Sequence, residues 1–137
     1  MSLMPASLSP ALQTFLALDF GLQRTGMAVG NRITRTAQPQ GTIAAQGDAR
    51  FKLIAQRLKD WQPDALVIGV PFHPDGAEHE NTLRARRFGR QLQGRFNLPV
   101  FEVDERYSTT EALQAGASDA DAAAACIILE QFLRSIP

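Results

Sequence analysis

The stretch FLALDFGLQRTGMAVG, residues 15–30, places a carboxylate in the middle of an apolar strand and follows it with a turn between two glycines. Burial of Asp19 without a partner would cost several kcal/mol or force the side chain to take up a proton. Proteins that keep such a residue usually hold a cation or a hydrogen-bond network against it. We therefore expect Asp19 to belong to a functional site; the alternative is a structural Asp that bonds the amides of its own turn.

An antiparallel, three-stranded opening is predicted around this stretch. Four residues separate Gly21 from Gly26, which suits a hairpin between a strand at 15–20 and a second strand formed by MAVG. The segment TAQPQGTI is a weaker third strand, in which Pro39 indicates the edge of a sheet.

Helices and strands alternate in the rest of the chain. Apolar residues fall at i, i+3, i+4 and i+7 from Phe51 to Leu58, which predicts an amphipathic helix that begins near Asp48 and ends before Pro63. By similar criteria we expect a buried strand at 65–71, a helix at 81–96, a strand at 100–106, a short helix near 109–114 and a final helix at about 119–133.

This order of elements predicts an α/β fold with a five-stranded mixed sheet. The first three strands are antiparallel, and right-handed crossovers then place the later, parallel strands beside strand one, with helices on the faces of the sheet. This is the ribonuclease-H-like plan. At 137 residues we expect one such domain, 14–137, after a flexible leader, 1–13, that contains two prolines and three serines.

The composition excludes some classes of protein and favours others. The sequence contains no apolar run of about eighteen residues and no basic-then-apolar leader, so we expect no membrane span, no signal peptide and a cytoplasmic location. The net charge is zero, but twelve of the fourteen basic residues are Arg, whose planar fork binds phosphate bidentately. The alternative is that a GC-rich genome encodes Arg where Lys would serve.

Acidic residues stand at the ends of three predicted elements. They are Asp19 in strand one, the pair Asp104 and Glu105 at the end of strand five, and Asp119 or Asp121 at the start of the last helix. Strands one and five run parallel into one sheet edge, so the fold can bring these acids together. Carboxylates without His or Cys are the ligands that Mg²⁺ or Mn²⁺ prefers, and a pair of such ions can promote phosphodiester hydrolysis.

Without a cation, the mutual repulsion of such a cluster should raise the pKa of at least one member. Each acid also has a structural alternative. Glu105 can form a surface ion pair with Arg106, and Asp119 or Asp121 can be a helix N-cap and nothing more.

A basic helix is the second signal for function. Residues 81–96 contain five arginines and no acid, a pattern that can follow a nucleic-acid backbone. The alternative is a solvated helix face that Glu78 and Glu80 partly neutralise. The side chains that we expect to bind substrate are Arg84, Arg87 and Arg90 of this helix, with Arg24 and Arg106 beside the carboxylates.

Four motifs in this order resemble the YqgF/RuvX family of bacterial ribonuclease-H-like proteins: LALDFGLQRTGMAVG, GVPFHPDG, VDERYST and DAAAACIILEQFL. The family is described as pre-16S rRNA nucleases and, earlier, as Holliday junction resolvases. The resemblance implies that Asp19, Glu105 and Asp121 are the catalytic, metal-binding acids. It also implies a phosphodiesterase that requires Mg²⁺ or Mn²⁺ and acts on structured RNA or DNA.

The leading hypothesis is therefore a metal-dependent nuclease that processes the 5′ end of pre-16S rRNA, with the small ribosomal subunit precursor as its partner. One alternative is a resolvase of DNA junctions, which would need two active sites and hence a dimer. Another is a non-catalytic nucleic-acid-binding module. An actin-like or sugar-kinase ATPase is disfavoured by length, since those proteins close two such domains on a nucleotide.

Overall fold

The structure, a computed structural model, describes residues 9–72, 75–104 and 119–137. These ranges contain five strands and three helices. They are β1 (Thr14–Phe20), β2 (Thr25–Asn31), β3 (Ala37–Ile43), α1 (Gly47–Trp61), β4 (Ala65–Val70), α2 (Glu80–Phe96), β5 (Val100–Asp104) and α4 (Ala120–Ser135). The short helix expected near 109–114 lies outside the described residues.

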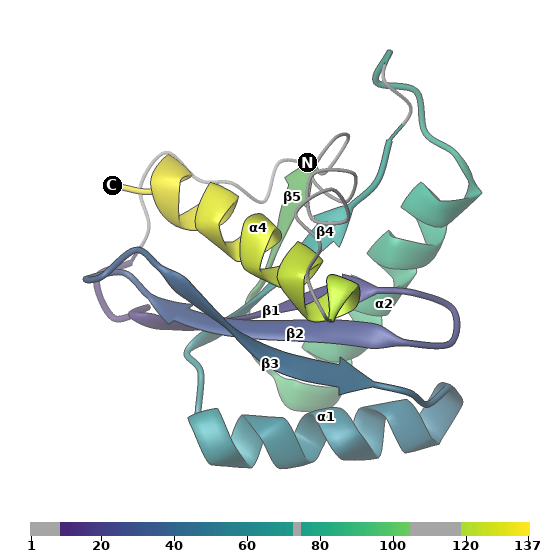
Figure 1. The fold of residues 1–137 in the computed structure, drawn as a ribbon, viewed down its shortest axis with the longest axis horizontal. Coiled ribbons are helices and arrows are strands. Elements are labelled where there is room, and N and C mark those ends of the chain that lie inside the picture. The colour runs from purple at the N-terminus through teal and green to yellow at the C-terminus, as the bar shows by residue number, and fades with distance from the viewer. Residues whose placement is uncertain (1–8, 73–74, 105–118) are drawn as a thin grey trace.

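The strands form one sheet in the order β3-β2-β1-β4-β5. β1 pairs antiparallel with β2, and β2 with β3, whereas β4 runs parallel to both β1 and β5. α4 crosses one face of the sheet, and α1 and α2 cover the other (Figure 1). The predicted mixed sheet with helices on its faces is confirmed.

The apolar run in β1 serves both faces of the sheet. Phe15 and Ala17 pack under α4, while Leu16 and Leu18 belong to the core beneath α1 and α2. This alternation follows from the two-residue period of a strand. Because helices cover both faces of the sheet, the sequences of β1 and β4 contain runs of consecutive hydrophobic residues.

Both ends of α4 are held by side chains from the β2–β3 region. At its start, the Asp119 carboxylate accepts hydrogen bonds from the Ala122 amide at 3.0 Å and from the Thr42 hydroxyl at 2.6 Å. At its end, the Arg35 guanidinium donates to the carbonyls of Leu133 and Ile136 at 2.6 and 2.7 Å. The Asp119–Ala122 bond and the two Arg35 bonds satisfy backbone groups that a helix leaves unpaired at its ends, and the Thr42 hydroxyl holds the Asp119 carboxylate in place.

Residues 9–13 are tied to the rest of the fold. The Arg32 guanidinium donates to the Ser9 carbonyl at 2.9 Å, and the Gln13 amide donates to the Asp64 carboxylate at 2.9 Å. The boundary between leader and domain at residue 14 stays a prediction. In the described ranges, no helix is both long and apolar enough to cross a membrane.

The first turn of α4 lies directly on β2 at Gly26. A Cβ atom at this position would overlap the carbonyl group of Asp121 and lie 2.8 Å from the amide nitrogen of Ala122. Only glycine allows this approach, because both of these groups belong to the backbone and cannot rotate away. Gly26 is also the cross-strand partner of Asp19, so this contact places the start of α4 above the end of β1.

We predict that Gly26→Ala displaces the start of α4 and lowers the free energy of unfolding by about 1–3 kcal/mol, because the added methyl group overpacks a backbone contact. Urea denaturation measures the loss. Gly94→Ala is the matched control, since nothing lies within 4 Å of a Cβ at that exposed helical position. The control should stabilise the protein by roughly 0.5–1 kcal/mol. Equal effects of the two substitutions would contradict the contact.

Candidate active site

The site is built around Asp19, the penultimate residue of β1. Asp19 faces α4, because it alternates with Phe20 and follows Phe15 and Ala17 on that side of the sheet. Burial raises the pKa of Asp19 from 3.8 to about 7, and the nearby charge of Asp121 contributes in the same direction. The expectation of a raised pKa in the cluster is confirmed, but desolvation contributes more to the shift than repulsion does.

Asp121 is in the first turn of α4 and forms an ion pair with Arg24. The Asp121 Oδ2 lies 3.1 Å from the Arg24 Nε, and the arginine side chain is 66% exposed. Solvent screens such a pair, so its contribution to stability is small. The pair matters for its position, because it sets a guanidinium beside Asp121 at the start of α4, where its charge also acts on Asp119.

The β1–β2 turn places Arg24. The amide of Gly21 donates to the carbonyl of Arg24 at 2.8 Å, which closes the turn. A Cβ at residue 21 would lie 2.8 Å from that same carbonyl oxygen, so a side chain would open the turn. The prediction that Arg24 lies close to the carboxylates is confirmed for Asp121.

Asp119 and Asp121 have different roles in the structure. The hydrogen bonds from Thr42 and from the Ala122 amide hold the pKa of Asp119 below its usual value. Asp119 is therefore the N-cap of α4. The sequence allowed this structural role for either Asp119 or Asp121. Asp121 is left to face Arg24 and Asp19.

Glu105 and Arg106 lie outside the described residues, so their place in the site stays a prediction. β5 ends at Asp104, and β5, β4 and β1 run parallel. The described end of β5 is therefore at the same edge of the sheet as Asp19. Asp104 itself is exposed.

Arg50 supports the β1–β2 turn from the opposite face, and sequence reasoning missed it. The side chain is only 4% exposed, and its guanidinium donates to the carbonyls of Leu22 at 2.6 Å and Ala45 at 3.0 Å. It also lies over the ring of Phe20, 4.6 Å from the centroid. Burial lowers the pKa of Arg50. The spacing of apolar residues that predicted α1 could not identify Arg50 as buried, because that spacing takes only hydrophobic residues into account.

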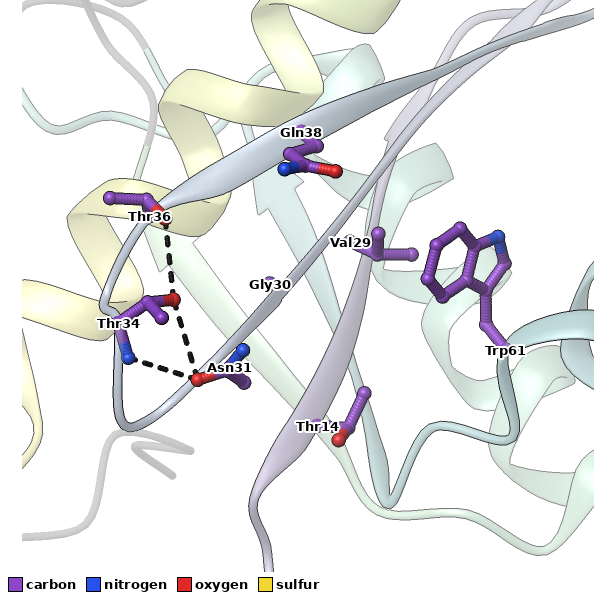
Figure 2. Close-up of a pocket in the computed structure, with 8 residues that line it drawn as sticks. All are labelled: Thr14, Val29, Gly30, Asn31, Thr34, Thr36, Gln38 and Trp61. Atoms are coloured by element: carbon purple, nitrogen blue, oxygen red, sulfur yellow. Dashed lines mark hydrogen bonds between the residues drawn. The ribbon is translucent and has the colours of Figure 1, made fainter.

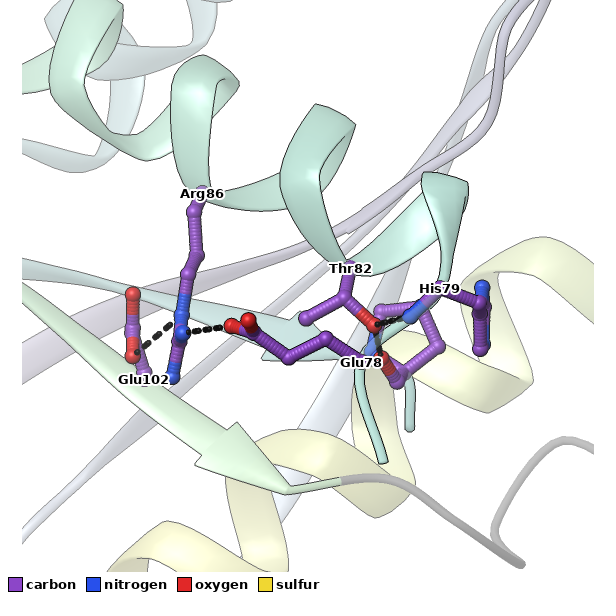
Figure 3. A network of polar contacts seen from close by, with 6 residues as sticks. Glu78, His79, Thr82, Arg86 and Glu102 are labelled. Atoms are coloured by element: carbon purple, nitrogen blue, oxygen red, sulfur yellow. Dashed lines mark hydrogen bonds and ion pairs between the residues drawn. The ribbon is translucent and has the colours of Figure 1, made fainter. Parts of the chain in front are cut away.

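A polar network fastens the loop after β4 to α2 (Figure 3). The buried Thr82 hydroxyl donates to the Pro71 carbonyl and accepts from the His79 amide at 3.1 Å. Arg86 lies between Glu78 and Glu102, at 2.5 and 3.4 Å, and so ties the loop to β5 as well. Arg86 is thereby neutralised by two acids.

The arginines of α2 fall into two groups. Arg84 pairs with Glu80 at 2.6 Å, and Arg95 pairs with Asp48 at 3.2 Å while lying over the Phe51 ring. Arg87 and Arg90 are both exposed, and neither makes an ion pair with any described residue. The positive charge of α2 is thus partly neutralised by acids, and the charge that remains without an ion-pair partner in the described part of the chain lies at Arg87 and Arg90.

The donors at the site fit a hard divalent cation. Asp19 and Asp121 supply carboxylate oxygens, and the described residues contain no group of three or more His, Cys, Asp or Glu side chains that could hold a metal ion. Mg²⁺ is commonly held by one or two carboxylates, with waters and substrate phosphates completing its shell. Burial and the charge of Asp121 raise the pKa of Asp19, so a bound cation would favour its ionised form.

The sheet order and the helices on its two faces define a ribonuclease-H-like fold. Thermus thermophilus RuvC in complex with a Holliday junction substrate is similar, with a TM-score of 0.52 and 14% identity over 89% of this chain and 94% of that chain. A second T. thermophilus RuvC structure gives a TM-score of 0.51 and 13% identity over 88% and 95%. At these identities the likeness concerns the fold alone.

The sequence comparisons identify the family. The family model described as "RuvX: Holliday junction resolvase" matches residues 13–135, and the chain belongs to this RuvX (YqgF) family of nucleases. A protein of Albidiferax ferrireducens is 81% identical over 96% of this chain and 85% of its own length. A Polaromonas protein is 74% identical, over 95% and 94%. Both are named "Putative pre-16S rRNA nuclease".

The raised pKa of Asp19 predicts how stability depends on pH. Between pH 3.8 and about 7 the unfolded chain has lost this proton while the folded protein keeps it. The free energy of unfolding should therefore fall as the pH rises through this window, by up to about 4 kcal/mol, and level off above it. Asp19→Asn should remove this component. Urea denaturation of both proteins from pH 4 to 8 measures it, and parallel pH profiles would contradict the raised pKa.

Proposed function

We propose that the protein is a divalent-metal-dependent nuclease that hydrolyses phosphodiester bonds during 5′-end processing of pre-16S rRNA. The observation that carries this proposal is the carboxylate pair at the sheet edge, in which burial and Asp121 raise the pKa of Asp19 to about 7. A partly buried acid pair is unfavourable for stability, so its presence beside an arginine supports a function that needs negative charge at this place.

Each residue of the site has a proposed role. Asp19 and Asp121, with Glu105 as the third acid, would hold Mg²⁺ or Mn²⁺. When bound, the cation would supply an activated water and stabilise the oxygen that leaves the phosphorus. Arg24 lies 3.1 Å from Asp121 and would donate to the non-bridging oxygens of the scissile phosphate. We assign the same role to Arg106.

The substrate is proposed to be structured RNA of the small ribosomal subunit precursor, and the protein to act in the cytoplasm. The names of the relatives support the choice of RNA. Arg87 and Arg90 would bind the backbone away from the scissile bond, because neither makes an ion pair with a described residue. Arg84 would contribute less, since Glu80 already lies 2.6 Å from it.

Cleavage of Holliday junctions is the second candidate activity. The description of the matching family and the likeness to the RuvC fold favour it. Symmetric cleavage of a four-way junction needs two active sites related by a two-fold axis, and hence a dimer. A non-catalytic nucleic-acid-binding module is the third candidate. It is less favoured, because binding nucleic acid alone would not require the carboxylates of Asp19 and Asp121.

The decisive test is the replacement of Asp19 by Asn. The protein is incubated with a pre-16S rRNA fragment, an unstructured single strand and a four-way DNA junction, each with Mg²⁺, Mn²⁺ or EDTA. We expect cleavage of the precursor in the presence of metal, and its loss in Asp19→Asn, because a neutral amide contributes no charge to the cation. Asp60→Asn, which changes an exposed acid on α1, should cleave normally. Full activity of Asp19→Asn, or of the wild type in EDTA, would overturn the proposal.

The two uncompensated arginines give a test of RNA binding. Replacing Arg87 and Arg90 together by Gln should weaken RNA binding at low salt. It should also flatten the plot of log K against log salt concentration by about 0.7–0.9 for each phosphate that the variant no longer neutralises. Arg84→Gln should have a smaller effect, because its ion pair with Glu80 already neutralises it. Filter binding in EDTA measures both. An unchanged slope in the double variant would assign these arginines to a solvated face with no role in binding.

A further inference from the structure

A second concave site lies at the end of β1 opposite to Asp19. It is a cavity of about 200 Å³ between the start of β1, the β2–β3 connection and the last turn of α1 (Figure 2). Thr14 at one end of β1 lines it, and Asp19 is five residues further along, a separation of about 17 Å at the rise of a strand. The cavity is therefore separate from the carboxylate site.

The lining of this cavity is polar but carries no charge. None of its eight residues is ionisable; hydroxyl and carboxamide groups supply the polar atoms, and Trp61 supplies the largest apolar surface. A site of this kind does not select a metal ion, a free phosphate or a carboxylate. It favours a neutral ligand that combines an apolar face with hydrogen-bonding groups.

Trp61 provides a flat wall. It is the last residue of α1 and 40% exposed, and its ring stands beside Val29 at the rim of the cavity (Figure 2). Most large aromatic side chains bury themselves in the core, so an exposed indole next to a cavity is suited to stack on a planar ligand. Base–aromatic stacking is worth about 1–3 kcal/mol per base in nucleic-acid-binding proteins.

Two carboxamides face the same space. The Asn31 Oδ1 accepts hydrogen bonds from the amides of Ile33 and Thr34, each at 2.9 Å, which holds the side chain in place. Its NH₂ group donates to none of the described residues and is available to a ligand. The Gln38 side chain makes no hydrogen bond with any described residue, so both its NH₂ donor and its carbonyl acceptor are available to a ligand. A carboxamide that offers both reads the edge of a base through two hydrogen bonds.

We propose that this cavity binds a nucleobase, which stacks on Trp61 and forms in-plane hydrogen bonds with Gln38 and Asn31. Its volume is below the roughly 300–1,000 Å³ of sites for drug-sized ligands, which limits the occupant to about one ring system. The base belongs either to a nucleic-acid strand or to a free nucleotide. This proposal does not depend on the nuclease activity.

Trp61 is also the reporter for the test, because it is the single tryptophan of the chain. Its fluorescence is titrated in EDTA with AMP, GMP, CMP and UMP, with a short single-stranded RNA, and with two controls. Ribose 5-phosphate lacks the base, and phenol has a ring without the edge of a base. We expect saturable quenching by ligands that contain a base and none by the controls. Asp19→Asn should give the same titration, which separates this site from the nuclease site.

A matched pair of variants tests the hydrogen bonds. Gln38→Ala should weaken binding about fivefold, because it removes the contacts to the base edge. Gln40→Ala changes the same residue type two positions further along β3, outside the lining, and should bind as the wild type does. Circular dichroism checks that both variants are folded. Trp61→Phe, measured by calorimetry, should keep weakened binding, because a smaller ring still stacks.

Relative affinities distinguish the two sources of the base. An RNA that binds at least tenfold more tightly than every mononucleotide assigns the cavity to a base in a strand, whereas equal affinities assign it to a free nucleotide. Quenching that does not saturate would overturn the proposal, as would an equal response to ribose 5-phosphate or phenol. Identical affinities of Gln38→Ala and Gln40→Ala would also overturn it.

Discussion

The contact between Gly26 and the backbone of Asp121 is the constraint on which the candidate site depends. A helix packed on a sheet normally stands off by the length of the side chains between them, but at Gly26 no side chain intervenes. The first turn of α4 therefore reaches the level of the sheet beside Asp19, the strand partner of Gly26. One missing Cβ thus converts two acids that are 102 positions apart in the chain into neighbours.

This arrangement places function and stability in opposition. Asp19 is partly buried, and Asp121 adds like charge, so the ionised form of Asp19 is unfavourable in the folded protein. Arg24 offsets part of the repulsion through its ion pair with Asp121, at an exposed position where solvent weakens the attraction. A ligand that binds only the folded state shifts the balance by mass action, so a divalent cation at this site would increase stability as well as supply chemistry.

Chemically identical arginines serve different purposes in this fold. Arg35 binds carbonyls at the end of α4, Arg50 supports the β1–β2 turn from within the core, and Arg86 joins a loop to β5 through two acids. Arg87 and Arg90 remain without ion-pair partners among the described residues. The skew toward Arg in the composition therefore reflects, in part, internal support of the fold, and counting the arginines of a helix overstates its uncompensated charge.

The sequence by itself determined the order and type of the elements, the mixed sheet and the candidacy of Asp19, because periodicity, turn glycines and an acid within an apolar strand are local signals. Residue patterns left Asp119 or Asp121 as the last acid, and the family motif favoured Asp121. The tertiary structure gave the physical reason, since the capping role of Asp119 depends on Thr42 from another strand. The burial of Arg50 and the cavity beside Trp61 were likewise decided by packing between segments distant in the chain, to which no local pattern of residues corresponds.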